Sequence, residues 1–138
     1  SAGNDNSIKL WSMDGRLIRT FTGHRKPIWK VVFSPDGRSL ASASGDNTVI
    51  LWNLDGTRIR TLKNPISSDK GENRLLSVAF SPDGKTLVAG DWYGNILWWN
   101  SDGTLINTTS EHRNAVGNLI FSPNGQTLAS GSWDNTIK

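Results

Sequence analysis

One short string occurs three times in this chain of 138 residues, in a fixed register. Phe-Ser-Pro-Asp-Gly, or its Asn variant, occupies Phe33–Gly37, Phe80–Gly84 and Phe121–Gly125. The copies start 47 and then 41 residues apart. A second string, Leu-Trp-x-x-Asp-Gly or a close variant, starts at Leu10, Leu51 and Trp98, which are 41 and then 47 residues apart. Periods of about 20–50 residues are typical of chains that stack copies of one supersecondary unit. We therefore interpret the chain as about three copies of one unit.

Each copy is expected to form four short β-strands. Runs of five to seven residues rich in Val, Ile, Leu, Phe, Thr and Trp alternate with Pro-Asp-Gly, Leu-Asp-Gly or Gly-Asp-Asn turns, and no run has helical periodicity. Proline presets φ near about −65° and glycine accepts positive φ, so Ser-Pro-Asp-Gly is typical of a tight turn between strands. The predicted fold class is all-β and antiparallel. In the best-defined copy we predict strands at residues 28–34, 38–44, 48–53 and 58–62.

The loops that differ between copies are expected at one end of each unit. Antiparallel strands reverse at every turn, so the repeated turns gather at one end and the variable loops at the other. Variable loops on a rigid scaffold are where recognition usually sits. The partner-binding candidates are Arg25, Lys26, Trp29, Trp92, Tyr93, Arg113 and Trp133. The competing interpretation is that the aromatic rings among them cover local backbone or pack between units.

The middle copy carries six extra residues between Leu62 and Leu75. The segment Asn64–Asn73 is polar, contains Gly and Pro, and is long enough for a small surface loop. We consider it a second candidate for ligand contact. The alternative is a loop that the fold merely tolerates.

The order of these motifs resembles the prokaryotic-type repeats of the WD-repeat (WD-40) β-propeller family. Gly-His, an apolar strand, Phe-Ser-Pro-Asp-Gly, Leu-Ala-Ser-x-Ser, Asp-Asn-Thr and Leu-Trp-Asn follow one another along the copy that begins at Gly23. The closing Trp-Asp of the family reads here as Trp11-Ser12, Trp52-Asn53 and Trp99-Asn100. The resemblance covers the whole chain. It implies a propeller segment of four-stranded antiparallel blades, about three blade equivalents in all.

The resemblance also sets the expected blade boundaries. Propellers typically need about four to eight blades, so three equivalents do not close a ring. We expect either a longer parent propeller or head-to-tail self-association through the terminal half-blades, two chains then giving about six blades. The expected parts of the single propeller segment 1–138 are a partial blade at 1–23 with the third and fourth strands, a complete blade at 24–63, a blade with the inserted loop at 64–110, and a partial blade at 111–138 with the first two strands and the start of the third.

Blades of this family are held by a buried network of Asp, His, Ser or Thr, and Trp side chains, which the resemblance assigns to matching positions here. An indole N–H only donates and a carboxylate only accepts, while Ser and neutral His do both, so such a set forms a closed chain of partners. The complete blade would use His24, Ser42, Asp46 and Trp52, with Ser44 as the alternative hydroxyl.

The other blades hold only part of this network. The last would use His112, Ser130 and Asp134, and the first only Asp5 and Trp11. The aligned positions of the middle blade are Pro65, Ala89, Tyr93 and Trp99, so three of the four members are replaced. We therefore predict that the middle blade is the loosest.

The sequence argues against catalysis and against a metal or cofactor. His24, Asp46 and Ser42 are the residue types of a hydrolase triad, but Ser is expected on a buried strand here, not on an exposed elbow. The chain has no cysteine, which excludes a thiolate zinc site. Residues 4–7 and 68–72 offer oxygen ligands without the spacing of a calcium loop.

The function expected from these features is that of a non-catalytic scaffold whose loop-rich face binds a peptide or protein. The alternative is recognition of a small ligand or glycan by the Trp and Tyr side chains of that face. The net charge of +3 divides into +5 over residues 1–63 and −2 over residues 64–138. We interpret the basic half as solvated strand faces, so a nucleic-acid partner is not expected. No apolar run approaches the ~18 residues that span a bilayer, and we expect a cytoplasmic protein without a membrane partner.

Overall fold

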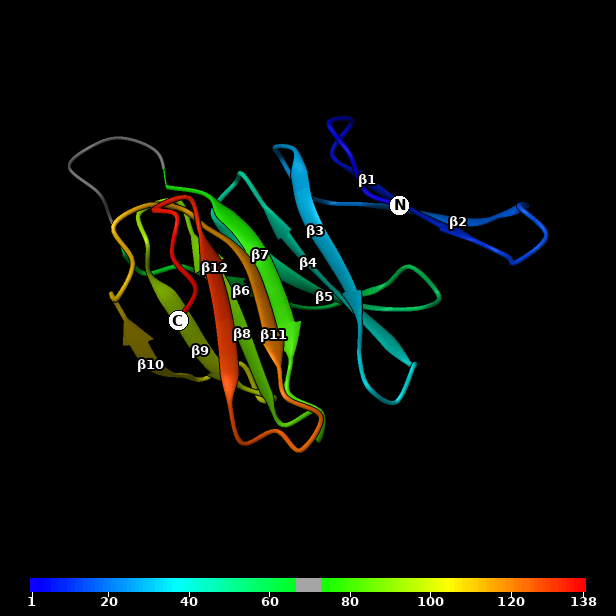
Figure 1. Cartoon of the computed structure of the whole chain (residues 1–138). Coiled ribbons are helices and arrows are strands. Elements are labelled where there is room, and N and C mark those ends of the chain that lie inside the picture. Colours follow the sequence, from blue (N-terminus) through cyan, green and yellow to red (C-terminus); the bar gives the residue numbers. More distant parts are fainter. Residues whose placement is uncertain (67–72) are drawn as a thin grey trace.

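The computed structural model describes residues 1–66 and 73–138, and these residues form twelve strands in four antiparallel sheets and no helix (Figure 1). The all-β fold class is thereby confirmed. The strands are β1 (Ser7–Trp11), β2 (Leu17–Thr22), β3 (Ile28–Phe33), β4 (Ser39–Ser44), β5 (Thr48–Asn53), β6 (Arg58–Lys63), β7 (Leu75–Phe80), β8 (Thr86–Asp91), β9 (Ile96–Asn100), β10 (Leu105–Thr109), β11 (Val116–Phe121) and β12 (Leu128–Ser132).

Strands that follow one another in sequence pair with one another in space. The first blade is the hairpin β1–β2, the second is β3–β4–β5–β6, the third is β7–β8–β9–β10 and the fourth is the hairpin β11–β12. In the second blade the strands predicted from sequence differ from the observed ones by at most one residue at either end. The turn residues that separate the strands explain this agreement, because they fix where each hairpin reverses.

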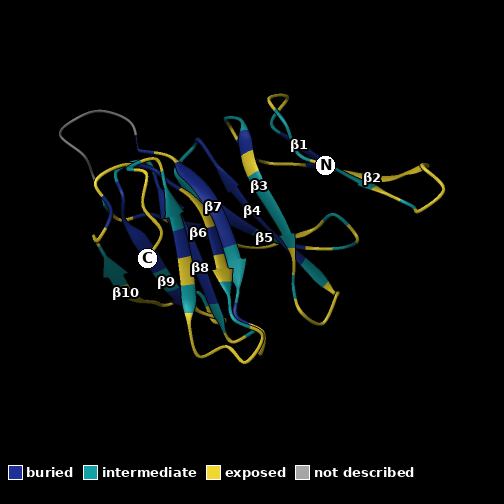
Figure 2. Ribbon diagram, viewed as in Figure 1, coloured by how far each residue is buried: buried dark blue, intermediate teal, exposed yellow. Residues whose placement is uncertain are grey.

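The blades stand side by side with their first strands innermost. β7 contacts both β3 and β11, and the two hairpin blades lie on opposite sides of the complete ones (Figure 1). The sheets form an open arc, since the fourth blade does not meet the first. Apolar side chains fill each space between neighbouring blades. Buried positions concentrate on β4, β5, β7, β8 and β9, and the turns at the lower edge of Figure 2 are exposed. The best-buried members are Ile8, Phe21 and Trp52 between the first and second blades, Val49, Leu75 and Leu97 between the second and third, and Val88, Val116 and Leu119 between the third and fourth.

The three Ser-Pro-Asp/Asn-Gly turns have one construction. In the second blade the amide of Gly37 donates to the Ser34 carbonyl over 2.9 Å, and the Ser34 hydroxyl donates to Oδ1 of Asp36 over 2.6 Å. Gly37 has φ of 69°, the left-handed region that glycine enters without strain. These turns share the lower edge of the molecule in Figure 1, and the variable loops lie at the opposite end. We call these the turn end and the loop end.

Candidate functional site

The network assigned to the complete blade is present as one hydrogen-bonded chain. His24 precedes β3, Ser42 lies on β4, Asp46 lies in the β4–β5 turn and Trp52 on β5. The indole Nε1–H of Trp52 donates to the Ser42 hydroxyl over 2.8 Å, and that hydroxyl lies 2.8 Å from Nε2 of His24. Nδ1 of His24 lies 2.9 Å from Oδ2 of Asp46. Since the carboxylate only accepts, Nδ1 carries the proton and Nε2 accepts from Ser42.

Asp46 is the acceptor at the end of this chain. Its carboxylate also receives the Thr48 hydroxyl over 2.6 Å and the Arg25 amide over 2.9 Å. Burial raises the pKa of Asp46, but the hydrogen bonds from His24, Thr48 and Arg25 outweigh it and hold the pKa well below the ordinary range. Ser42 is fully buried and its hydroxyl is engaged on both sides, so the triad-like trio offers no exposed nucleophile. The arrangement ties the loop end to the inner strands.

The alternative hydroxyl has a different role. The Ser44 hydroxyl contacts the backbone carbonyls of Lys26 and Pro27, each over 3.0 Å, and accepts the Asp46 amide over 3.1 Å. Ser44 therefore fastens the β4–β5 turn to the loop before β3. It makes no hydrogen bond to His24 or Trp52.

The fourth blade repeats the network without an indole. His112 lies 2.7 Å from the Ser130 hydroxyl through Nε2 and 2.9 Å from Asp134 through Nδ1. The Thr136 hydroxyl is the main cause that lowers the pKa of Asp134; burial opposes it, and the Arg113 amide and His112 add to the lowering. No tryptophan of the described residues donates to Ser130.

The first blade keeps neither of its two assigned residues in such a network. Asp5 pairs with Lys9 over 2.5 Å and accepts the Ser7 amide over 3.1 Å. Trp11 is 46% exposed and donates to the Ser1 hydroxyl over 3.1 Å. The structure therefore does not bring Asp5 and Trp11 together.

The third blade holds a buried cluster that the sequence analysis missed. The carboxylate of Asp91 is fully buried, and its Oδ2 accepts the side-chain amides of Asn73 over 2.7 Å, Asn95 over 2.8 Å and Asn64 over 3.3 Å. Oδ1 accepts the backbone amides of Asn95 and Tyr93 over 2.8 and 2.9 Å. This cluster stands where Pro65, Ala89 and Tyr93 leave the common network incomplete. Its signal in the sequence is the carboxylate at the position of Ser44 and Ser132 in the sister blades.

Two of the candidate aromatic residues meet across a blade boundary at the loop end. The rings of Trp92 and Trp133 have centroids 5.2 Å apart and cross at 75°. The guanidinium of Arg74, which was not among the candidates, lies 5.3 Å from the centroid of the Trp92 ring. Trp133 is 57% exposed and Trp92 partly buried. We call Arg74, Trp92 and Trp133 the Trp92 patch.

Trp29 lies in the second blade, on β3, and is 48% exposed. Its Nε1 is 3.3 Å from the point that a Cβ of Gly45 would occupy. Trp133 has the same relation to Gly117, at 3.1 Å, so each exposed indole lies over a glycine of its own blade. Each ring thus covers local backbone and is exposed at the same time. The interpretation as a partner-binding residue and the interpretation as a cover of local backbone therefore do not exclude each other.

The remaining candidates lie in three loops: Arg25 and Lys26 between β2 and β3, Tyr93 between β8 and β9, and Arg113 between β10 and β11. Arg25 and Arg113 are exposed, and their backbone amides donate to Asp46 and Asp134 over 2.9 and 3.0 Å, which fixes where each side chain leaves the loop. Lys26 and Tyr93 are partly buried.

The inserted segment lies partly outside the described residues. Asn64 and Asn73 are described and belong to the Asp91 cluster, whereas residues 67–72, with the oxygen-bearing Ser68, Asp69 and Glu72, lie outside. Over residues 1–66 and 73–138 no group of three or more His, Asp and Glu side chains could hold a metal ion. The same residues contain no helix long and apolar enough to cross a membrane.

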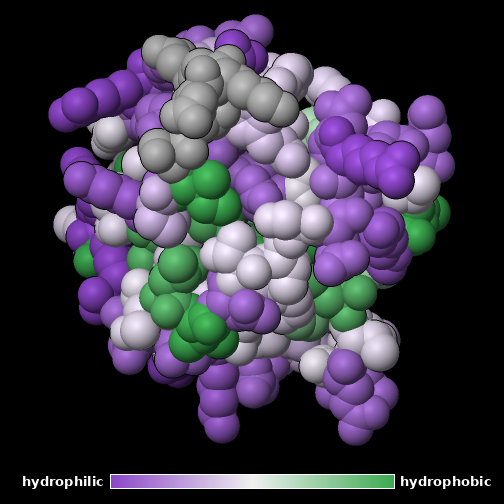
Figure 3. All heavy atoms as spheres, turned by 90° about the vertical axis from the view of Figure 1, so that its left-hand side faces the viewer, coloured by the Kyte–Doolittle hydropathy of each residue, from purple (hydrophilic) through white to green (hydrophobic). Residues whose placement is uncertain are grey.

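Aliphatic side chains also reach the surface on the blades near the chain end. Figure 3, which views the molecule from the side of β10, shows hydrophobic patches between hydrophilic ones. The exposed aliphatic residues of the third and fourth blades are Leu105, Ile106, Ile120 and Ile137.

The chain belongs to the WD40 family of WD domain, G-beta repeat proteins, because the family model matches residues 15–53, 56–100 and 103–138. Each match spans the outer strand of one blade and the inner strands of the next. The chain is 40% identical over 42 residues to the WD40 repeat-containing protein HOS15 of Arabidopsis thaliana, 46% over 44 residues to the nuclear distribution protein nudF of Aspergillus terreus, and 44% over 39 residues to the F-box-like/WD repeat-containing protein TBL1X of Mus musculus. These matches cover 30%, 32% and 28% of the chain but only 7%, 10% and 7% of the relatives.

Proposed function

We propose that the chain is a non-catalytic module that binds a peptide or protein partner through its loop end. Repeat proteins of the WD40 family are generally protein-interaction scaffolds and typically lack catalysis. The single observation that carries the proposal is the Trp92 patch, in which two indoles and a guanidinium from adjacent blades form one surface.

The chemistry of the patch suits a protein partner. Tryptophan and arginine are enriched among residues that dominate interface energies. Tryptophan offers a large contact area at low rotamer cost, and arginine offers a planar group that stacks on aromatic rings and carries five hydrogen-bond donors. A cation–π contact at an exposed site contributes about 0.5–1 kcal/mol, enough to bias the orientation of Arg74 before a partner arrives. Buried networks hold the blades beneath the patch in place, so the blades lose little conformational entropy when a partner binds.

A non-catalytic role is supported by the burial of the triad-like trio in the second blade. The Ser42 hydroxyl is enclosed and fully hydrogen-bonded. Its repetition in the fourth blade as Ser130 with His112 fits a structural role, since a catalytic centre has no need of two copies.

Glycan or small-ligand recognition is the second candidate. The exposed indole faces of Trp29 and Trp133 favour it, because flat aromatic rings also stack on the apolar faces of sugars. A protein partner needs the contiguous patch, whereas a sugar needs one free ring.

Peptide and glycan arrays probed with matched variants test both functions. Trp133→Ala and Trp29→Ala remove the exposed indoles, and Met13→Ala, a fully exposed residue of the β1–β2 turn, is the control. We expect peptide signals that fall at least tenfold in Trp133→Ala and persist in the control. Signals on the glycan array alone would replace the first function with the second, and binding that survives both tryptophan changes would refute both.

We further propose a cytoplasmic location without nucleic-acid or membrane partners. Cell fractionation followed by immunodetection of the chain checks the location. Recovery with the membrane pellet would contradict it.

A further inference from the structure

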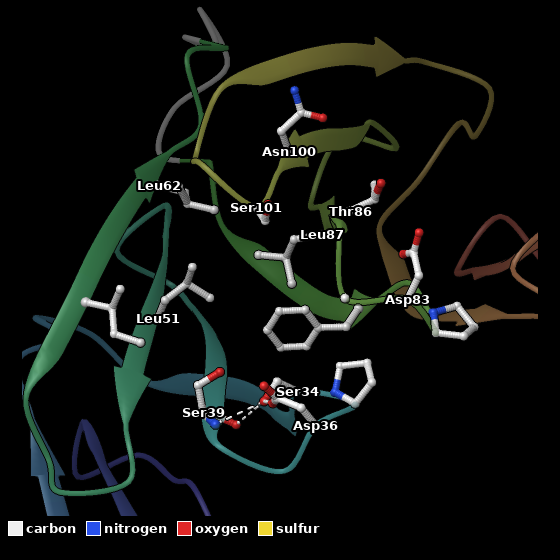
Figure 4. Close-up of a pocket in the computed structure, with 15 residues that line it drawn as sticks. Ser34, Asp36, Ser39, Leu51, Leu62, Asp83, Thr86, Leu87, Asn100 and Ser101 are labelled. Atoms are coloured by element: carbon white, nitrogen blue, oxygen red, sulfur yellow. Dashed lines mark hydrogen bonds between the residues drawn. The ribbon is translucent and has the colours of Figure 1, made fainter.

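A groove opens between the second and third blades, and residues of the turn end line it. It has a volume of about 490 Å³, within the range of about 300–1,000 Å³ common for small-ligand sites. Figure 4 shows Leu51 and Leu62 on one side and Leu87 on the other, pointing into the same space. Phe80 and Ile59 complete the apolar walls. The groove is independent of the surface assigned above to a protein partner.

The mouth of this groove is polar and carries two carboxylates. Asp36 and Asp83 line it with hydroxyl and amide groups, and the described residues of the lining include no Lys, Arg or His. Within the described residues each Asp uses only Oδ1 for its turn, accepting a serine hydroxyl over 2.6 Å and a backbone amide over 3.0 Å. Oδ2 of both carboxylates is therefore left for a ligand. The hydroxyls of Ser34 and Ser81 hold the pKa values of Asp36 and Asp83 below the ordinary range, so both remain charged.

The same groove recurs between the third and fourth blades with a different charge. Its volume is about 500 Å³, and every residue that lines it is the repeat equivalent of a residue that lines the first groove. Two differences matter: Trp98 replaces Leu51, and Asn124 replaces the carboxylate of Asp83 in the corresponding turn. Asn124 keeps both turn contacts, since its Oδ1 accepts the Ser122 hydroxyl over 2.7 Å and the Gln126 amide over 3.1 Å.

We propose that the groove between the second and third blades binds an amphipathic ammonium compound, with its apolar body between Leu51, Phe80 and Leu87 and its cationic head at Asp36 and Asp83. A charge-assisted hydrogen bond to a carboxylate is stronger than one between neutral groups, although water screens it partly because both carboxylates are exposed. The apolar walls supply affinity by excluding water from the body of the ligand.

Arg38 and Lys85 oppose this binding. Each follows its Asp by two residues and is exposed, and neither lines the groove. Each acts electrostatically on its own Asp, so its charge weakens the attraction that a cation feels at the mouth. The third turn carries Gln126 at this position, so Arg38→Gln and Lys85→Gln are substitutions that the turn already accommodates.

Isothermal titration with three matched probes tests the proposal on the whole chain. Phenylbutylammonium carries the proposed head, phenylbutanol is its neutral counterpart and phenylbutyrate its anionic one. We expect the ammonium to bind at least fivefold more tightly than the alcohol, with no measurable binding of the carboxylate. Asp36→Asn and Asp83→Asn, which reproduce the side chain of Asn124, should each weaken the ammonium about 3- to 5-fold, the range of a solvent-accessible ion pair, and leave the alcohol unchanged. Lys85→Gln should strengthen it.

Three outcomes overturn the proposal. Equal binding of the ammonium and the alcohol would show that the carboxylates play no part, and so would an Asp36→Asn/Asp83→Asn double variant with wild-type affinity. No binding of any probe would show that the groove is not a ligand site. Ile59→Ala distinguishes the contribution of the apolar walls from that of the carboxylates. Ile59 is half-exposed, so the variant folds, and it should weaken the binding of the ammonium and of the alcohol by the same factor. Because these variants do not touch the Trp92 patch, failure here leaves the proposed protein-binding function standing.

Discussion

Removal of one hydroxyl from the second blade should cost more stability than removal of its repeat equivalent in the fourth. In Ser42→Ala, the Trp52 indole N–H and Nε2 of His24 both lose their partner at 2.8 Å. Trp52 is 1% exposed and the His24 side chain is fully buried, so water replaces neither contact. A buried polar group left unpaired costs about 1–3 kcal/mol, which gives about 2–4 kcal/mol for the pair after partial relaxation. Ser130→Ala leaves only His112 unpaired and should cost about 1–2 kcal/mol.

Urea denaturation followed by far-ultraviolet circular dichroism measures both variants, with the free energy of unfolding taken by linear extrapolation. Trp52→Phe and the double variant Ser42→Ala/Trp52→Phe complete a cycle that isolates the indole–hydroxyl coupling, which we expect to be at least about 1 kcal/mol. If Ser42→Ala costs no more than Ser130→Ala, or if the coupling is zero, the network does not lock the blade through this hydroxyl.

Three further predictions concern acid, the third blade and assembly. The pKa of Asp46 is lower in the folded chain than in the unfolded chain. The stability that this carboxylate contributes is therefore fully present above about pH 5 and is lost as pH falls below about 4. In urea titrations at pH 7 and pH 3, the free energy of unfolding should fall less in Asp46→Asn than in wild type. Asp91→Ser should lower the hydrogen-exchange protection of β8 and β9, because it removes the acceptor of the Asp91 cluster. In the wild type, protection of these strands should equal or exceed that of residues 25–63. Unchanged protection in the variant would contradict the role of the cluster. We also propose that copies of the chain associate through the half-blades. The mass measured by light scattering should then rise with concentration, and it should fall in Ile120→Lys, because Ile120 is 61% exposed on β11. A monomer at every concentration would refute this.

The prediction for the third blade reverses the expectation from sequence. Loss of three network positions predicted the loosest blade, but Asp91 and its three amide partners fill that role from other positions. The third blade also has a neighbour on each side, as the second does, whereas the fourth is open on its outer side.

Much of the fold could be predicted because it is locally encoded. Strand limits follow from turn residues such as Gly37, whose positive φ marks where a hairpin reverses. The network of the second blade could also be assigned, since His24, Asp46 and Trp52 have distinct hydrogen-bonding chemistry and fixed places in the repeat.

The parts that could not be predicted depend on contacts between segments distant in sequence. Asn64 and Asn73 reach Asp91 across 27 and 18 residues, and nothing in their local sequence distinguishes them from loop residues. The contact of Arg74 with Trp92 and that of Trp92 with Trp133 likewise depend on how a loop folds and how blades pack. A repeat alignment compares equivalent positions, so it does not reveal contacts between positions that are not equivalent.

The paired indoles and glycines of the loop end show this limit most clearly. When the repeats are aligned, Trp29 of the second blade corresponds to Gly117 of the fourth, and Gly45 of the second corresponds to Trp133 of the fourth. The alignment therefore suggests two unrelated substitutions. In space each indole lies over the glycine of its own blade, so the two substitutions compensate in volume. Neither Gly45 nor Gly117 has a positive φ, and the backbone therefore gives no reason for glycine at either position. The reason is the ring: each of these two blades has room for one indole at this place, supplied by β3 in the second blade and by the residue after β12 in the fourth. The loop end thus keeps an exposed aromatic surface while the residues that build it change from blade to blade.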